Sequence, residues 1–335
     1  MRPPSLGIIV VALLALCATT TADAARKRHR ARAAVADTIR TTACDRTCLN
    51  AFVDRYVEAL IAHDAGRAEL APEFRWTENG VSVAPGAGLW QTVTDLGDYR
   101  IRAIDATTGQ AALLGVLMEA ERLTMFALRL KVVRRRITEA EIVVARNVPE
   151  TFTQAAPRLR SARRAFGDRV DPAVRVPRAQ MIEAANAYYD GVGTDGGGSV
   201  PFAADCHRIE NGVALVNNPD FRFDLVSPAG KELPNFAAMG CREQFDTGIW
   251  STDTVTSRRF PLVDEERGIV VAFTLYNVHA RSRCAEVAGY GQVCPAAELQ
   301  PFSLDLVEFL RVGDGRIHEM ESVWTVLPPG GGTGW

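Results

Sequence analysis

Two stretches of the chain carry the same helical pattern of apolar residues. In each, apolar side chains recur at i, i+3, i+4, i+7, i+8 and i+11, which places them on one face of a helix. The first set runs from Leu49 to Leu60 and the second from Met181 to Val192. The pattern therefore predicts two amphipathic helices, and their apolar faces are 132 positions apart in the sequence.

After each helical stretch the pattern becomes that of β-strands. Apolar runs bounded by Gly, Asp or Pro predict strands, and Asp314-Gly315 predicts a tight hairpin between the last two. A helix followed by strands, twice, predicts an α+β fold in which helices pack on a curved antiparallel sheet in each half. The clearest strand runs are Leu114–Leu117, Met125–Val133, Gly268–Val278 and Phe302–Val312.

Short matching blocks connect the two halves. FRWTENGV (Phe74 to Val81) and CHRIENGV (Cys206 to Val213) share Glu-Asn-Gly-Val at an offset of 132, and GLWQT from Gly88 matches GIWST from Gly248 at 160. RITEAE from Arg136 matches RIHEME at 180. Collinear blocks predict an internal duplication. The growing offset predicts two insertions in the second copy, of 28 and about 21 residues.

The cysteines follow these insertions. Cys206 and Cys241 flank the first insertion, and Cys284 and Cys294 lie inside the second. A crosslink removes most chain entropy from a long loop, so we predict disulfides within these two pairs. Cys44 and Cys48 remain, and would staple the entry to the first helix. A regular helix holds i, i+4 side chains too far apart for a disulfide, so an irregular first turn is expected. No Cys-x2-Cys pair is present, and no metal site is predicted.

The N-terminus predicts export. The apolar run from Leu6 to Cys17 follows Arg2 and precedes Ala22-Asp23-Ala24, the layout of a secretory signal peptide. Lipid attachment at Cys17 is the alternative, disfavoured by the bulky Leu16. The predicted divisions are a signal peptide (1–24), a basic disordered tail (25–43), a first domain (44–147), a linker with a short helix (148–178) and a second domain (179–335) with disulfide-closed insertions.

The composition of the chain excludes few classes of function. The chain has 335 residues, 47% of them hydrophobic, and a formal net charge of −2, so global charge indicates no particular partner. We predict that the basic segment from Arg26 to Arg32 is a solvated tail. The alternative is that it anchors the protein to polyanions or anionic lipid. We find no integral membrane segment, nucleic-acid-binding pattern or phosphate loop, and predict a secreted or periplasmic protein.

Several motifs resemble a known superfamily. DRYVEALIAHD (Asp54 to Asp64), WTENG (Trp76 to Gly80) and VGDGRI (Val312 to Ile317) resemble the nuclear transport factor 2-like superfamily, which includes SnoaL-like polyketide cyclases and ketosteroid isomerases. The whole chain is similar to an uncharacterised group of secreted fungal and bacterial proteins. The resemblance implies two tandem cone-shaped α+β-barrel domains, each enclosing an apolar pocket. Such pockets host cofactor-free isomerases, dehydratases, cyclases and lyases, and also binding modules.

The resemblance also suggests site residues. The helix tyrosine that donates to an oxyanion in ketosteroid isomerases matches Tyr56 and Tyr188. The catalytic carboxylate position matches Asn79 and Asn211, with Glu78 and Glu210 one position earlier. Side chains alternate along a strand, so that one step decides whether a carboxylate or an amide enters the pocket.

Ionisable residues concentrate in the second copy, which favours that copy for proton transfer. We predict that His207 or His279 shuttles the proton, that Glu210 is the partner base, and that Tyr188 and Arg258 polarise or anchor the substrate. Each residue has a simpler alternative: Glu210-Asn211-Gly212 is also typical of a hairpin turn, His207 could decorate a strand, and His279 could lie at the core edge. Asn211, Trp250 and Trp324 are the further predicted substrate-binding residues.

The sequence thus supports two hypotheses. The first is a secreted, cofactor-free acid/base enzyme, a lyase, dehydratase or isomerase, acting on a small organic or sugar-like substrate in the second domain. The second is a non-catalytic small-molecule-binding or structural module in which the duplicated domains pack through their sheets. A homodimer is compatible with either. The two are separated by whether His207, Glu210 and His279 converge on one cavity.

Overall fold

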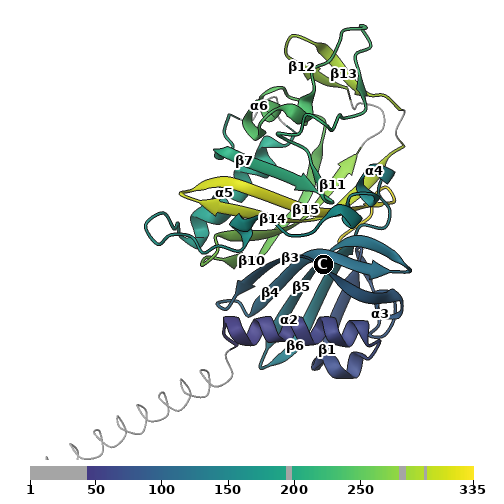
Figure 1. Cartoon of the computed structure of the whole chain (residues 1–335), viewed down its shortest axis with the longest axis vertical. Helices are drawn as coiled ribbons and strands as arrows, with labels where there is room; N and C mark the ends of the chain where they lie inside the picture. Colours follow the sequence, from purple (N-terminus) through teal and green to yellow (C-terminus); the bar gives the residue numbers. More distant parts are fainter. Residues whose placement is uncertain (1–43, 194–197, 279–283, 298–299) are drawn as a thin grey trace, which may run out of the picture. The chain divides into compact units, whose positions relative to one another are not determined.

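The computed structural model describes residues 44–193, 198–278, 284–297 and 300–335. The predicted signal peptide and basic tail lie outside these residues. Residues from Cys44 to Trp335 form one compact unit. Each of its two halves contains a long helix and a six-stranded sheet, and the second half also carries a three-stranded sheet (Figure 1). The predicted α+β class, with helices on curved sheets, is confirmed.

The first half begins with a helix whose apolar face is the predicted one. Helix α2 spans Arg46–Ile61 and buries Leu49, Phe52 and Leu60 on its sheet-facing side. It contacts β3, β4 and β5 of the sheet (Figure 1). The remaining elements are η1 (Ala65–Ala68), β1 (Leu70–Glu78), β2 (Val81–Ser82), α3 (Leu89–Thr92), β3 (Val93–Asp105), β4 (Gln110–Glu119), β5 (Arg122–Val133) and β6 (Arg136–Val144).

A connector with a short helix leads to the second half, where α5 contacts β10, β11, β14 and β15. Its elements are α4 (Glu150–Thr153), η2 (Ala156–Arg158) and η3 (Arg164–Phe166) in the connector, then α5 (Arg178–Gly191), β7 (Phe202–Glu210), β8 (Val213–Ala214), β9 (Leu225–Val226), η4 (Phe236–Ala238), α6 (Cys241–Asp246), β10 (Thr254–Asp264), β11 (Ile269–Val278), β12 (Ala285–Val287), β13 (Gly291–Pro295), β14 (Phe302–Gly313) and β15 (Arg316–Leu327).

The two sheets have the same strand order. The first runs β2-β1-β6-β5-β4-β3 and the second, read from its other edge, β8-β7-β15-β14-β11-β10. The register also agrees: Glu78 is opposite Ile142 as Glu210 is opposite Ser322. All neighbours are antiparallel except β1 with β6 and β7 with β15, so the predicted antiparallel sheets each contain one parallel pair.

The central strands are buried on both faces. One face of each sheet packs on its own helix, and the other face packs on the opposite sheet. Val271, Phe273, Val307 and Phe309 of the second sheet form one apolar cluster with strands β3 to β6 of the first. This explains why β4 and β11 are nearly continuous apolar runs instead of alternating patterns, and why β14 is buried along most of its length.

Polar contacts between the halves occur in reciprocal pairs. Asp264 accepts a hydrogen bond from the Ile104 amide (2.9 Å), and Asp105 accepts one from the Val263 amide (3.0 Å). Arg46 at the start of α2 forms an ion pair with Asp264, and Arg178 at the start of α5 lies 2.7 Å from Asp105. Each contact thus recurs with the two halves exchanged, as in the self-complementary interface of a symmetric dimer.

The two Glu-Asn-Gly blocks form hairpin turns. Asn79 and Asn211 have φ of 48° and 43°, and the glycines that follow have φ of 76° and 82°, which is the backbone of a tight hairpin. The Asn211 side chain exchanges two hydrogen bonds with the Trp324 backbone, both of 3.0 Å, and Asn79 does the same with Val144. The asparagine ties the hairpin to the last strand of its sheet, so Asn211 has a structural role.

The three predicted disulfides are confirmed: Cys44–Cys48, Cys206–Cys241 and Cys284–Cys294. An irregular first turn was expected, but the disulfide is accommodated because the helix begins only after Cys44. Asp45 is the N-cap, with an extended backbone, and Cys44 precedes it. The first disulfide therefore crosses the helix start and leaves the helical turns regular.

Removing the Cys206–Cys241 disulfide should destabilise the protein more than removing Cys44–Cys48. The bonds join residues 35 and 4 positions apart, and loop-closure entropy predicts losses of about 4 and about 2 kcal/mol. Urea unfolding of the two double Cys→Ala variants measures both. Equal losses would contradict a loop-length origin.

No helix within the described residues is long and apolar enough to cross a membrane.

Candidate functional site

A small cavity lies inside the second half, between α5, the sheet and the loop after α6. Its volume is about 120 Å³. Strands β7, β11, β14 and β15 supply most of the wall. Four of its lining residues carry acidic or basic groups, two are tyrosines, and the other six are apolar or aromatic. The lining residues are Tyr188, Val192, Arg208, Glu210, Phe245, Trp250, Asp253, Tyr276, Leu304, Leu306, Glu308 and Trp324.

An ion pair occupies one wall of this cavity. The Arg208 Nε lies 3.1 Å from the Glu210 Oε1, and the Trp324 indole donates to Glu210 Oε2 at 3.0 Å. On its other side Arg208 donates to Gln244 (3.2 Å), and its guanidinium carbon is 4.5 Å from the centre of the Trp250 ring. Burial raises the pKa of Glu210, against the lowering effect of Arg208. The two side chains hold each other in fixed positions.

Glu308 faces the same cavity from β14 and has no cationic partner at hydrogen-bond distance among the described residues. The Tyr189 hydroxyl donates to its Oε2 at 2.5 Å. Burial raises the pKa of Glu308 to about 7, even though that hydrogen bond lowers it. A carboxyl group with a pKa near neutrality can both accept and return a proton at physiological pH.

Two phenols complete the polar wall. Burial raises the pKa of both Tyr188 and Tyr276 well above the ordinary value, and the nearby Glu308 raises it further. These side chains therefore stay protonated, and each can donate a hydrogen bond to an oxygen of a bound molecule. The arrangement places one titrating carboxyl group beside neutral donors in a small, largely buried space.

The first half has apolar side chains at the equivalent positions. By the shared register, Arg208, Tyr276, Glu308 and Trp324 correspond to Trp76, Leu117, Leu128 and Val144. All four of the latter belong to the apolar core beneath α2. The position of Glu210 is Glu78, whose carboxylate is held by Arg146 (2.6 Å) and the Leu89 amide (2.8 Å). Arg208 and Glu308 thus have no charged counterpart in the first half.

The structure brings four of the predicted site residues together. Tyr188, Glu210, Trp250 and Trp324 all line the cavity. Of the pair Glu210 and Asn211, the carboxylate enters the cavity.

Three other predicted residues, His207, Arg258 and Asn211, do not line it. His207 lies between the buried Cys206 and Arg208 on β7, so its side chain leaves the sheet on the opposite face. Arg258 binds Asp190 (2.6 Å) and the Asn186 carbonyl on the outer side of α5. Asn211 is engaged by the Trp324 backbone, as described above. His279 lies outside the described residues, and its role stays a prediction.

Glu308 and Tyr276 were missed by sequence reasoning. Both lie in strands that are buried on both faces, so the sequence pattern does not show which face a residue takes. A signal did exist: Glu308 is a charged residue inside the run LDLVEFL, where every neighbour two positions away is leucine. A carboxylate at a core position is rare unless it is paired or functional.

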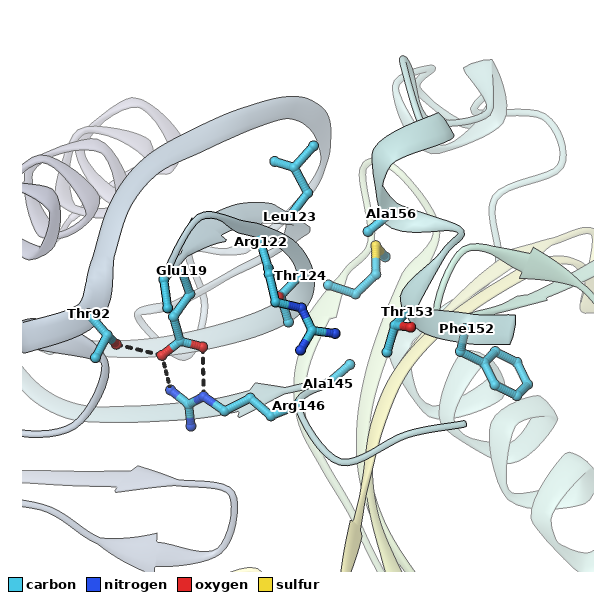
Figure 2. Close-up of a pocket in the computed structure, with 12 residues that line it drawn as sticks. Thr92, Glu119, Arg122, Leu123, Thr124, Ala145, Arg146, Phe152, Thr153 and Ala156 are labelled. Carbon is cyan, nitrogen blue, oxygen red and sulfur yellow. Dashed lines mark hydrogen bonds and ion pairs between the residues drawn. The ribbon is translucent and has the colours of Figure 1, made fainter. Parts of the chain in front are cut away.

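A second cavity, of about 260 Å³, lies at the end of β4 and β5 beside the connector (Figure 2). Its acid is neutralised by an arginine: Glu119 receives two hydrogen bonds of 2.7 Å from Arg146 and one from Thr92. Burial acts to raise the pKa of Glu119, but these hydrogen bonds lower it overall. The carboxylate stays charged at neutral pH, so this cavity offers no group suited to proton transfer.

Comparisons with known proteins bear on part of the chain. A family model described as "Domain of unknown function (DUF8021)" matches residues 174–324. No curated protein sequence matches the chain.

Solved structures similar to the chain are small domains. A protein of unknown function with cystatin-like fold from Methylobium petroleophilum PM1 is 18% identical, with a TM-score of 0.27, and the alignment covers 32% of this chain and 82% of that one. An NTF2-like protein of unknown function from Cytophaga hutchinsonii is 10% identical, with a TM-score of 0.24 and coverages of 29% and 87%. The Mtr2–Mex67 M domain complex of C. albicans is 14% identical, with a TM-score of 0.26, and the alignment covers 45% of this chain and 98% of that one.

Proposed function

We propose that the second half is a cofactor-free acid/base enzyme, a lyase, dehydratase or isomerase, that acts on a small carbonyl compound in the cavity. Glu308 is the general base, and Tyr188 and Tyr276 donate hydrogen bonds to the carbonyl oxygen. The predicted histidine base is not retained, because His207 does not converge with Glu210 on the cavity. The observation that carries the proposal is instead Glu308, a buried carboxyl group with a pKa of about 7 beside neutral phenols.

The chemistry follows from these groups. Glu308 takes the proton from the carbon next to the carbonyl, and the electron pair of that C–H bond moves toward the carbonyl oxygen. The phenols stabilise the negative charge that develops there. Glu308 then returns the proton to another carbon in an isomerase. In a lyase or dehydratase, the electron pair instead expels a leaving group from the neighbouring carbon.

The ion pair of Arg208 and Glu210 has a supporting role in this proposal. Glu210 is less suited to be the base, because Arg208 and the Trp324 indole both favour its charged form. The pair fixes Trp324 and Trp250 around the cavity and contributes no net charge.

The proposal is tested by exchange of deuterium into small ketones. Wild-type protein in D2O should exchange C–H next to the carbonyl of acetone, cyclohexanone or dihydroxyacetone, followed by NMR. Glu308→Gln should lower the rate by about 10²–10⁴-fold, because proton transfer by a positioned base contributes that much. The wild-type rate should rise with pH through about 7, where Glu308 loses its proton.

Asp305→Asn is the matched control. Asp305 is also a buried carboxyl group with a pKa raised to about 7, and it lies on the same strand. It is three positions from Glu308 and therefore faces the opposite sheet. Its variant should keep the exchange activity. Ketones that bind without exchange would support a non-catalytic binding module instead.

We also propose that the halves arose by tandem duplication and that the protein is exported. The shared strand order, register and reciprocal contacts support the first proposal. Three disulfides support the second, since they persist in oxidising compartments. The signal peptide, the domain boundaries and a homodimer stay predictions.

A further inference from the structure

The cavity has a larger neighbour. A second chamber of about 390 Å³ shares Trp250 and Asp253 with it. Its lining exposes much more apolar than polar surface, although Arg222, Asp224 and Asp253 also belong to it. The side chains that give it this character are Phe152, Phe221, Phe223, Leu225, Ile249 and Val293.

Three segments that the first half lacks meet at this outer chamber. Phe152 comes from the connector helix α4, Phe223 from the insertion closed by Cys206–Cys241, and Val293 from the hairpin closed by Cys284–Cys294. The two insertions are joined because β9 pairs with β13. The disulfides and this pairing therefore hold the walls of one chamber.

Two tryptophans stand between the chambers. The Trp250 ring contacts the Arg208 guanidinium on the inner side and lies 5.5 Å, centre to centre, from Phe223 of the outer wall. Trp324 lines the inner cavity and packs at 4.9 Å against Phe152 of the outer wall. A molecule that reaches Glu308 through this chamber would pass aromatic surfaces on two sides.

The charges favour an uncharged group in the inner cavity. Glu210, Asp253 and Glu308 line it, and Arg208 is the only cation among the lining residues. A carboxylate or phosphate placed there would face more negative than positive charge, which disfavours its binding.

We propose that the ligand has two parts: a neutral carbonyl or hydroxyl head in the inner cavity and an aromatic body in the outer chamber. This deepens the function proposed above and rests on it for the chemistry of the head. The insertions of the second half then determine which substrate class is bound.

The test uses three probes measured by calorimetry and competition: 2-acetylnaphthalene, acetone and 2-naphthoate. 2-Acetylnaphthalene has both the neutral head and the aromatic body, acetone has the head alone, and 2-naphthoate has the same body with an anionic head. 2-Acetylnaphthalene should bind about 100-fold more tightly than acetone, because its rings leave water in the outer chamber. 2-Naphthoate should bind at least about 10-fold more weakly than 2-acetylnaphthalene.

Phe223→Ala should weaken the binding of 2-acetylnaphthalene about 10-fold. Val226→Ala is the matched control, because Val226 is exposed and lies outside the chamber lining. Equal affinity for 2-acetylnaphthalene and acetone, or equal losses in the two variants, would overturn the proposal. The expected binding pattern without any ketone exchange would support the two-part ligand and reject the general-base function.

Discussion

Replacing Asp264 with alanine should destabilise the protein by about 3–5 kcal/mol. The Asp264 carboxylate is buried, accepts hydrogen bonds from the Ile104 and Arg267 amides, and pairs with Arg46. Its loss leaves the Ile104 and Arg267 amides without their acceptor and removes one of the two carboxylates paired with Arg46, the other being Glu266. Removing one partner of a buried ion pair has this cost. Urea unfolding followed by circular dichroism measures it.

Because the contacts are reciprocal, we also expect the equivalent residue of the first half to contribute as much stability. Asp105→Ala should cost about as much, because Asp105 makes the equivalent contacts with Val263 and Arg178. The double variant should lose about 6–10 kcal/mol, as much as a typical domain has in total, and fail to fold. Asp168→Ala removes only an exposed pair with Arg164 and should cost ~0–1 kcal/mol. If Asp264→Ala were as mild as Asp168→Ala, the reciprocal contacts would not hold the halves together.

Stability should fall as the pH rises from about 4.5 to about 8. Burial raises the pKa of Glu321 from 4.5 to about 8, with a further increase from Glu319, against the lowering effects of the Tyr99 hydrogen bond and Arg163. Burial likewise raises the pKa of Asp305 to about 7, helped by Glu141.

The sign follows from proton binding. A carboxyl group whose pKa is higher in the folded state favours folding fully below the unfolded pKa, and this stabilisation is lost as the pH passes through the folded pKa. For Glu321 the loss between pH 4.5 and 8 is roughly 3–5 kcal/mol. The carboxyl groups of Asp305 and Glu308, whose pKa burial raises to about 7, add to the same slope.

Urea unfolding at pH 5, 6, 7 and 8 measures this slope. Glu321→Gln should flatten it, because the amide cannot ionise. Glu139→Gln is the control: hydrogen bonds from Arg129 and Lys131 lower the Glu139 pKa despite burial, so its effect falls below pH 4.5. A Glu321→Gln slope parallel to the wild type would reject the assignment of the titrating group.

Much of the fold could be predicted because its signals are local. The apolar faces of α2 and α5, the Asp314-Gly315 turn and the Asn-Gly hairpins each depend on a few neighbouring residues. The disulfide pairs could be predicted because insertions change the spacing between matching blocks, and spacing is visible in the sequence.

The site could be predicted only in part. Tyr188 and Glu210 were reached through the pattern of the helix and of the hairpin strand. His207 was expected beside them, yet one step along β7 turns its side chain to the other face, and a one-residue change of position does that in any strand. Glu308 was missed because its strand is buried on both faces, so that apolar periodicity does not tell which side is the cavity.

By itself the sequence determined the two helices, the strand content, the hairpin turns and the cysteine pairs, because each is set by contacts between residues close in the chain or by spacing. The sequence also favoured the second half for the site, but only the tertiary structure decided which of its side chains line the cavity. Arg208, Tyr276, Glu308 and Trp324 come from four strands, and only the pairing of those strands turns their side chains toward one space. The same pairing fills the first half with Trp76, Leu117, Leu128 and Val144, because apolar side chains at these positions pack against each other and leave no polar surface.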